Sequence, residues 1–176
     1  MIYYRTPYSL DKRLDEYYNA EMALLPNDDD WCCFLDGDAM FLTPDFGHQI
    51  QEIVNANPNF DLFTCITNRV GTKYQCVEDM WQTNDIEKHR EVAEYYNGND
   101  LILDITTYAP LSGVMILLNK KAWRESGGFT HKGMLGVDNS IHYNIRNAGM
   151  QVGLMLGVYV YHWYRGGDAK NKAHLL

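Results

Sequence analysis

Residues 31–38 read Trp-Cys-Cys-Phe-Leu-Asp-Gly-Asp, a continuous apolar run that ends on two carboxylates. An apolar run that does not alternate with polar residues predicts a strand covered on both faces. Asp36 and Asp38 follow it two residues apart, so their side chains point roughly the same way. Because an unpaired buried carboxylate is very costly, a positive partner must meet them. A divalent cation carrying a phosphate is the simplest candidate, and an ordinary Asx-type turn is the alternative.

Strand and helix patterns alternate along the rest of the chain. Apolar runs predict further strands at residues 2–5, 60–66, 112–118 and 151–161. Apolar spacing and capping residues predict helices, caps included, at residues 10–25, 43–55, 85–96, 119–127 and 137–148. Residues 68–83 lack periodicity and are expected to form a long, functional or mobile loop. The alternation predicts an α/β layered domain with a largely parallel sheet, whose ligands bind beyond the carboxyl ends of the strands.

Chain length, composition and net charge limit the classes of protein to which this chain can belong. A chain of 176 residues with 46% hydrophobic residues suits one domain, residues 1–176, with a packed core. The net charge of −8 argues against a nucleic-acid partner bound through a broad basic surface. No apolar run has the length of a transmembrane segment and the N-terminus is not a signal peptide. We therefore expect a cytoplasmic protein, or one held at a membrane surface by a partner.

The four cysteines form no Cys-x-x-Cys pair, which argues against a zinc ribbon or a redox motif. Three of them lie in predicted core strands. We interpret them as small buried hydrophobic residues in a reducing compartment. They are Cys32, Cys33, Cys65 and Cys76.

Three motifs far from Asp36 also carry polar groups at the ends of predicted elements. Ser112-Gly113 opens a strand and is expected to leave backbone N–H groups free for a phosphate or a sugar hydroxyl, unless it is an ordinary start of a strand. Asp138 opens a helix, either as a functional carboxylate or as a capping one. His162 ends the last strand between aromatic residues, as a ligand or as a structural histidine.

Taken in chain order, these motifs resemble those of the GT-A glycosyltransferases. The likeness is to family 2 enzymes and to the catalytic domain of polypeptide N-acetylgalactosaminyltransferases. In those families a strand ending in Asp-x-Asp precedes a Ser-Gly or Gly-Gly strand and a short helix that closes on Gly-Gly. An acidic residue then opens a helix, and a His follows the final strand. The corresponding residues here are Asp36/Asp38, Ser112-Gly113, Gly127-Gly128-Phe129, Asp138-Asn139 and His162.

The resemblance covers roughly residues 30–165 and implies a GT-A fold in an N-terminally abbreviated form. Family members usually carry a longer N-terminal half, whereas only 35 residues precede Asp36 here. The segment from Tyr4 to Ser9 stands where the family has its first strand and base-binding loop. The acidic pair that the family has before the helix is here Val137-Asp138.

The resemblance implies transfer of a sugar from a nucleotide diphosphate sugar to a hydroxyl of a saccharide, lipid or protein acceptor. The cofactor would be Mn²⁺ or Mg²⁺, with Asp38 and His162 as ligands and Asp36 contacting the metal through water or the ribose. Asp138 would be the general base, which gives inversion at the anomeric carbon. If Asp138 only binds a sugar, retention is the alternative.

Further residues are candidates for substrate contact. Arg5, Thr6, Pro7 and Tyr8 are expected at the base. Asn68, Arg69, Trp81 and Gln82 are expected at the donor or the acceptor, with a core tryptophan as the alternative for the aromatic residue. Arg165 is expected at the diphosphate, with a solvated surface arginine as the alternative.

Two other classes of protein fit parts of this pattern. A metal-dependent phosphohydrolase or nucleotidyltransferase also uses paired carboxylates at the end of a strand, but it has no need of His162. A degenerate sugar- or nucleotide-binding module would keep the fold without the reaction. Binding of a donor nucleotide, measured with and without Mn²⁺, distinguishes the non-enzymatic module from a transferase.

Overall fold

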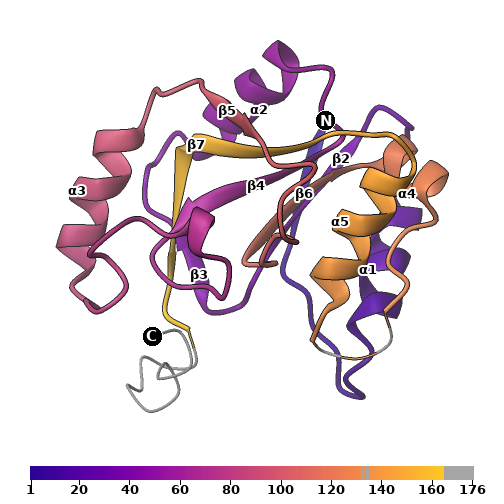
Figure 1. Ribbon diagram of the computed structural model, residues 1–176, viewed down its shortest axis with the longest axis horizontal. Helices are drawn as coiled ribbons and strands as arrows, with labels where there is room; N and C mark the ends of the chain where they lie inside the picture. Colours follow the sequence, from indigo (N-terminus) through magenta and orange to yellow (C-terminus); the bar gives the residue numbers. More distant parts are fainter. Residues whose placement is uncertain (132, 134, 165–176) are drawn as a thin grey trace.

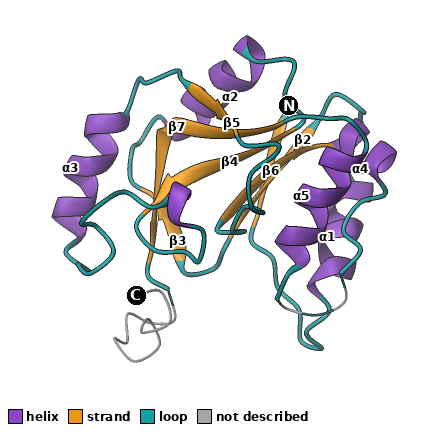
Figure 2. Cartoon of the chain, in the orientation of Figure 1, coloured by secondary structure: helices purple, strands orange, loops and turns teal. Residues whose placement is uncertain are grey.

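The computed structural model describes residues 1–131, 133 and 135–164. Within them the chain forms a seven-stranded sheet flanked by helices (Figure 1, Figure 2). The strands are β1 (Ile2–Arg5), β2 (Trp31–Leu35), β3 (Ala39–Phe41), β4 (Leu62–Thr67), β5 (Ile102–Asp104), β6 (Met115–Asn119) and β7 (Val152–His162). The helices are α1 (Leu14–Ala23), α2 (Phe46–Ala56), the 3-10 turn η1 (Lys73–Gln75), α3 (Ile86–Tyr96), α4 (Lys120–Ser126) and α5 (Val137–Asn147).

The sheet is mixed, so the prediction of a largely parallel sheet is wrong. Its order is β1-β2-β6-β4-β7-β3, with β5 paired to β7 as well. Only β1 with β2 and β4 with β7 run parallel; the other four pairs are antiparallel. The segment before β6 reaches the sheet at the carboxyl end of β2, where Asp36 N donates to Val114 O at 3.1 Å. A strand that starts at that end must run antiparallel to β2. The sequence does not reveal this direction, because an apolar run has the same pattern whichever way the strand runs.

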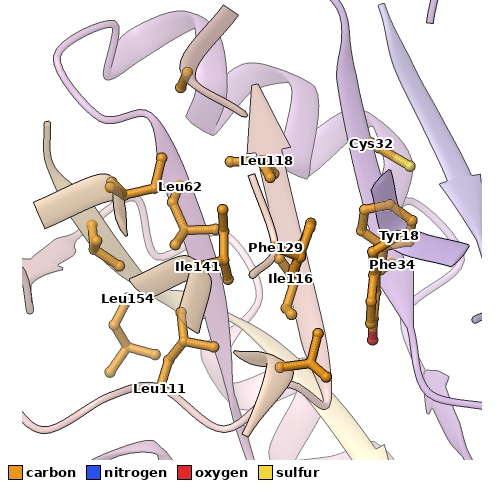
Figure 3. Close-up of a cluster of buried hydrophobic side chains, with 14 of the residues drawn as sticks. Tyr18, Cys32, Phe34, Leu62, Leu111, Ile116, Leu118, Phe129, Ile141 and Leu154 are labelled. Atoms are coloured by element: carbon orange, nitrogen blue, oxygen red, sulfur yellow. The ribbon is translucent and has the colours of Figure 1, made fainter. Parts of the chain in front are cut away.

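Alternate side chains of the central strands point into two cores, one on each face. On one face Phe34, Ile116 and Leu118 pack with Tyr18 of α1 and Ile141 of α5 (Figure 3). On the other face the intervening strand residues Cys33, Phe63, Met115 and Leu117 pack with Ile50 and Ile53 of α2. Helices therefore cover both faces, which confirms an α/β layered domain. Three of the four cysteines are buried in these cores, and all four are free.

The strand β7 bends sharply along its length (Figure 1). Cys65 pairs with Met155 whereas Ile66 pairs with Tyr159, so residues 156–158 of β7 form a bulge opposite β4. A Cβ on Gly157 would lie 1.9 Å from the carbonyl oxygen of Asn99. The residues of β7 that follow the bulge pair with β3, whereas the residues that precede the bulge pair with β5.

The two shortest strands are absent from the sequence prediction. β3 and β5 have three residues each, which is too short for a readable pattern, and each is held by backbone pairing with β7. The predicted loop at residues 68–83 contains η1 and a bridge between Thr67 and Cys76.

The helix boundaries agree with the sequence prediction where a side chain forms the cap. Asp85 accepts a hydrogen bond from Glu87 N at 3.1 Å, and Asn119 accepts one from Ala122 N at 3.1 Å. The helix α1 begins at Leu14 rather than residue 10, because Ser9 Oγ accepts Arg13 N in a separate turn. The helix α2 begins at Phe46, so the predicted cap at residue 43 is wrong. No helix within the described residues combines the length and apolar character that crossing a membrane requires.

The close approach at the bulge predicts that Gly157→Ala destabilises the fold. A Cβ there collides with backbone, which cannot move aside as a flexible side chain can, so we expect a loss of about 2–4 kcal/mol. Gly71→Ala is the matched control, because a Cβ at Gly71 meets no atom within 4 Å. The free energy of unfolding in urea measures both. Equal stability of the two variants would contradict the role given to Gly157.

Candidate metal centre

Asp36, Asp38 and His162 meet at the carboxyl end of β2. Each contributes one potential ligand atom, and the three atoms lie within 4.8 Å of one another. Pairing of β3 with β7 sets Ala39 opposite His162, and Trp163 N donates to Asp38 O at 2.9 Å. His162 Nε2 consequently lies 3.2 Å from Asp38 Oδ1. The structure thus brings together the three residues that the sequence predicts as metal ligands.

Neighbouring groups orient the imidazole of His162. Its Nδ1 lies 2.7 Å from the carbonyl oxygen of Arg69, and a carbonyl can only accept, so Nδ1 carries the proton. Asn68 binds the backbone of His162 on both sides: Asn68 Oδ1 accepts His162 N at 2.7 Å, and Asn68 Nδ2 donates to His162 O at 3.0 Å. In the neutral ring this leaves the Nε2 lone pair directed at the carboxylates, as a metal ligand requires.

Asn68 and Arg69, predicted as substrate contacts, make their observed hydrogen bonds to protein groups. Both are fully buried. The guanidinium of Arg69 donates to the carbonyl oxygens of Trp81, Thr83 and Trp163 and to Asn84 Oδ1. Burial lowers the pKa of Arg69. In this structure the two residues position His162 and the 81–84 segment, and a contact with substrate stays a prediction.

Asp36 is held in an unfavourable environment for a charge. Burial raises the pKa of Asp36 to about 7; His162 opposes this shift, and the negative charges of Asp38 and Asp138 add to it. Burial likewise raises the pKa of Asp138. A cation bound at Asp36, Asp38 and His162 would offset the repulsion among these carboxylates. Two carboxylates and one imidazole are a donor set that suits Mn²⁺, and the oxygen atoms also suit Mg²⁺.

The cluster opens into a cavity of about 380 Å³ that Asp138 lines as well. Asp138 Oδ2 accepts Gly113 N and Asp138 Oδ1 accepts Asn139 N, each at 2.9 Å. A Cβ on Gly113 would lie 3.0 Å from the Cβ of Asp138, so this close approach favours glycine. The carboxylate of Asp138 is therefore fixed in place at the first turn of α5.

The expectation that Ser112 and Gly113 offer free backbone N–H groups is wrong. Ser112 N donates to Gln75 Oε1 at 2.7 Å, and Gly113 N donates to Asp138 Oδ2. Gln75 and Asp138 are themselves polar groups in need of partners, and they lie far from this strand in sequence. Both Ser112 and Gly113 still line the cavity.

The predicted base-binding segment lies beside the Asp-Gly-Asp turn. A Cβ on Gly37 would lie 3.6 Å from Thr6 Cγ2, whereas the Tyr8 side chain is exposed. Arg5 forms an ion pair with Glu21, with Nε 2.7 Å from Oε2. Contacts of these residues and of Pro7 with a nucleotide stay predictions.

Three further predicted contacts are not among the described residues that line the metal cavity. Trp81 lines a separate cavity next to the first, and the side chain of Gln82 is exposed. Arg165 lies outside the described residues.

Tyr18 of α1 lines the cavity and is absent from the sequence prediction of the site. It is nearly fully buried and stacks on Phe129 with ring centroids 4.6 Å apart. Burial raises the pKa of its hydroxyl strongly, and the charges of Asp36 and Asp138 raise it further. The helical spacing of residues 10–25 marks Tyr18 only as a core residue, so the sequence carries no signal for its place at the cavity.

A scan against models of protein families finds no match, and no curated protein sequence matches this chain. The function of the chain is therefore inferred from the chemistry of the site.

The environment of Asp36 predicts a pH-dependent stability difference for Asp36→Asn in a chelator. The folded pKa of about 7 lies above the usual value near 3.8, so wild-type stability falls as pH rises from about 4 to 7. Asn does not ionise, so the variant should exceed wild type by on the order of 2 kcal/mol at pH 8 and match it near pH 4. Thermal unfolding across pH measures the difference.

Asp29→Asn is the control for this prediction, because Asp29 is exposed. Its free energy of unfolding should stay close to that of wild type. A difference between Asp36→Asn and wild type that does not change with pH would contradict the environment assigned to Asp36.

Proposed function

We propose that this chain is a metal-dependent glycosyltransferase that moves a sugar from a nucleotide diphosphate sugar to an acceptor hydroxyl. One observation carries the proposal: Asp36, Asp38 and His162 converge on the cavity that also contains Asp138. A candidate metal-binding cluster and a separate half-buried carboxylate within one cavity supply the two functions that glycosyl transfer requires. They hold the charge of the leaving diphosphate and accept a proton from the attacking hydroxyl.

The finer fold assignment belongs to this proposal. The Asp-Gly-Asp turn follows β2 at its carboxyl end, and helices cover both faces of the sheet. Both features support a GT-A-type fold in which β1 and α1 precede β2 and its turn. The pairing of β1 parallel to β2 keeps residues 6–8 at the edge where a nucleotide would bind.

The proposed cofactor is Mn²⁺ or Mg²⁺, held by Asp38 and His162, with Asp36 as a third ligand or as a contact to ribose. When bound, the cation would neutralise charge on the leaving diphosphate. Asn68 and Arg69 keep the imidazole of His162 in the orientation that this role needs. The imidazole ligand favours Mn²⁺ over Mg²⁺.

Asp138 is the proposed general base. The acceptor oxygen bonds to the anomeric carbon as the bond from that carbon to the diphosphate oxygen breaks, and the hydroxyl proton passes to a carboxylate oxygen of Asp138. Its two N–H contacts hold the carboxylate, and each oxygen keeps a lone pair for the incoming proton. Attack from the face opposite the diphosphate inverts the anomeric carbon.

The place of His162 supports transfer over phosphate hydrolysis. A phosphohydrolase with paired carboxylates has no need of an imidazole, whereas here His162 Nε2 lies 3.2 Å from Asp38 Oδ1, one hydrogen bond orients the ring and two more hold the backbone of His162. The identity of the donor, the class of acceptor and a cytoplasmic location stay predictions.

Asp38→Asn should abolish metal-dependent nucleotide binding. Loss of a charged ligand weakens the metal and, with it, the diphosphate, so we expect a decrease of about 100-fold or more. Calorimetry with uridine, guanosine, cytidine and thymidine diphosphates, with and without Mn²⁺, measures it, with Asp29→Asn as the control. Wild-type protein that binds none of them in the presence of Mn²⁺ would refute the proposal.

Asp138→Asn should leave that binding intact and reduce turnover of nucleotide sugars by about 10²–10⁴-fold, because the amide cannot accept the proton. Release of the nucleotide diphosphate from a panel of nucleotide sugars with Mn²⁺ measures turnover. The amide keeps one of the two acceptor oxygens, so stability should fall by only about 1 kcal/mol. Turnover at the wild-type rate would remove Asp138 as the base.

A further inference from the structure

A second cavity lies against the metal cavity. It has a volume of about 540 Å³ and is formed by residues 69–81, the segment that the sequence predicts as a loop. Val70 and Gly71 line both cavities. Gly71 is exposed, and a Cβ built on it meets no atom within 4 Å. The two cavities therefore share a wall that carries no side chain at Gly71.

The walls of the second cavity are held in place by buried hydrogen bonds. Gln75 is fully buried; its Nε2 donates to Thr64 Oγ1 at 3.0 Å and its Oε1 accepts Ser112 N. Val77 N donates to Thr67 O at 2.8 Å. Arg69 anchors the far end of the segment through the carbonyl of Trp81. A cavity with such walls is preformed, which is typical of ligand sites.

The lining of this cavity suits a neutral saccharide. Trp81 is partly buried and contributes an aromatic surface, beside the apolar side chains of Val70 and Val77. Aromatic rings pack against the C–H faces of sugars. Glu78 and Asp79 are exposed carboxylates that can accept hydrogen bonds from sugar hydroxyls.

The charges of the lining disfavour an anionic ligand. Lys73 is the exposed cation among the lining residues, and two exposed carboxylates outnumber it. The guanidinium of Arg69 already donates to protein oxygens. A diphosphate is therefore repelled here and better suited to the metal cavity.

We propose that the second cavity is the acceptor subsite and binds a neutral saccharide. From it, the reacting hydroxyl reaches over Gly71 into the cavity that contains Asp138 and the metal ligands. This inference rests on the proposed glycosyl transfer for the reaction, whereas saccharide binding in the second cavity can be measured without it.

Saccharide binding is tested with four disaccharides: maltose, cellobiose, lactose and N,N′-diacetylchitobiose. Saturation-transfer NMR should show binding of at least one to wild type and at least 10-fold weaker binding to Trp81→Ala. Tyr95→Ala, an exposed aromatic residue on α3, is the control and should bind as wild type does. Binding of none of the four by wild type, or equal binding by Trp81→Ala, would overturn the subsite.

Asp38→Asn separates this result from the proposed function. The variant should keep saccharide binding even though it loses Mn²⁺-dependent nucleotide binding. If wild type binds a saccharide through Trp81 but no nucleotide, the proposed transfer fails while the saccharide site stands. Loss of saccharide binding in Asp38→Asn would place the saccharide at the metal cavity and overturn the second site.

The connection over Gly71 is tested with Gly71→Leu, assayed with Mn²⁺, the nucleotide sugar that wild type hydrolyses and the disaccharide that binds. The new side chain should reduce transfer to the disaccharide at least 10-fold, and by a larger factor than it reduces hydrolysis of the nucleotide sugar. Thr107→Leu adds the same side chain at an exposed position outside both cavities and is the control. Unchanged transfer by Gly71→Leu would refute the passage.

Discussion

Asp38 Oδ1 and His162 Nε2 lie 3.2 Å apart because the three residues of β3 pair with the last residues of β7. That pairing depends on the bulge at residues 156–158, which bends β7 after it has paired with β5. The bulge in turn needs Gly157, where the backbone of Asn99 comes too close for a side chain. The candidate metal centre at the edge of the sheet is thus supported by a backbone feature in the middle of its longest strand.

Three carboxylates line the cavity, and the folded state keeps them close together despite their mutual repulsion. Burial and mutual repulsion raise the pKa of Asp36 to about 7. A protein selected for stability alone would have no reason to place Asp36, Asp38 and Asp138 around one cavity. Ligand sites commonly contain such strain, and a bound cation would relieve it.

Residues 68–83 connect the candidate metal centre with the second cavity. The backbone of Arg69 orients His162, while its side chain anchors the segment that carries Trp81. Gln75, within this segment, binds Thr64 of β4 and the backbone of Ser112, which precedes β6. The segment lacks periodicity in the sequence because its order comes from these single contacts, each to a group distant along the chain.

The sequence by itself determined the layered α/β class, the buried strand that ends in Asp36 and Asp38, and the helix caps at Asp85 and Asn119. Apolar runs and capping side chains are local signals, so they can be read without coordinates. Only the tertiary structure decided the direction of β6, the pairing of β3 with β7, the position of Tyr18 and the second cavity. Each of these depends on hydrogen bonds or packing between residues distant in the chain, and an apolar run is the same whichever neighbour it meets.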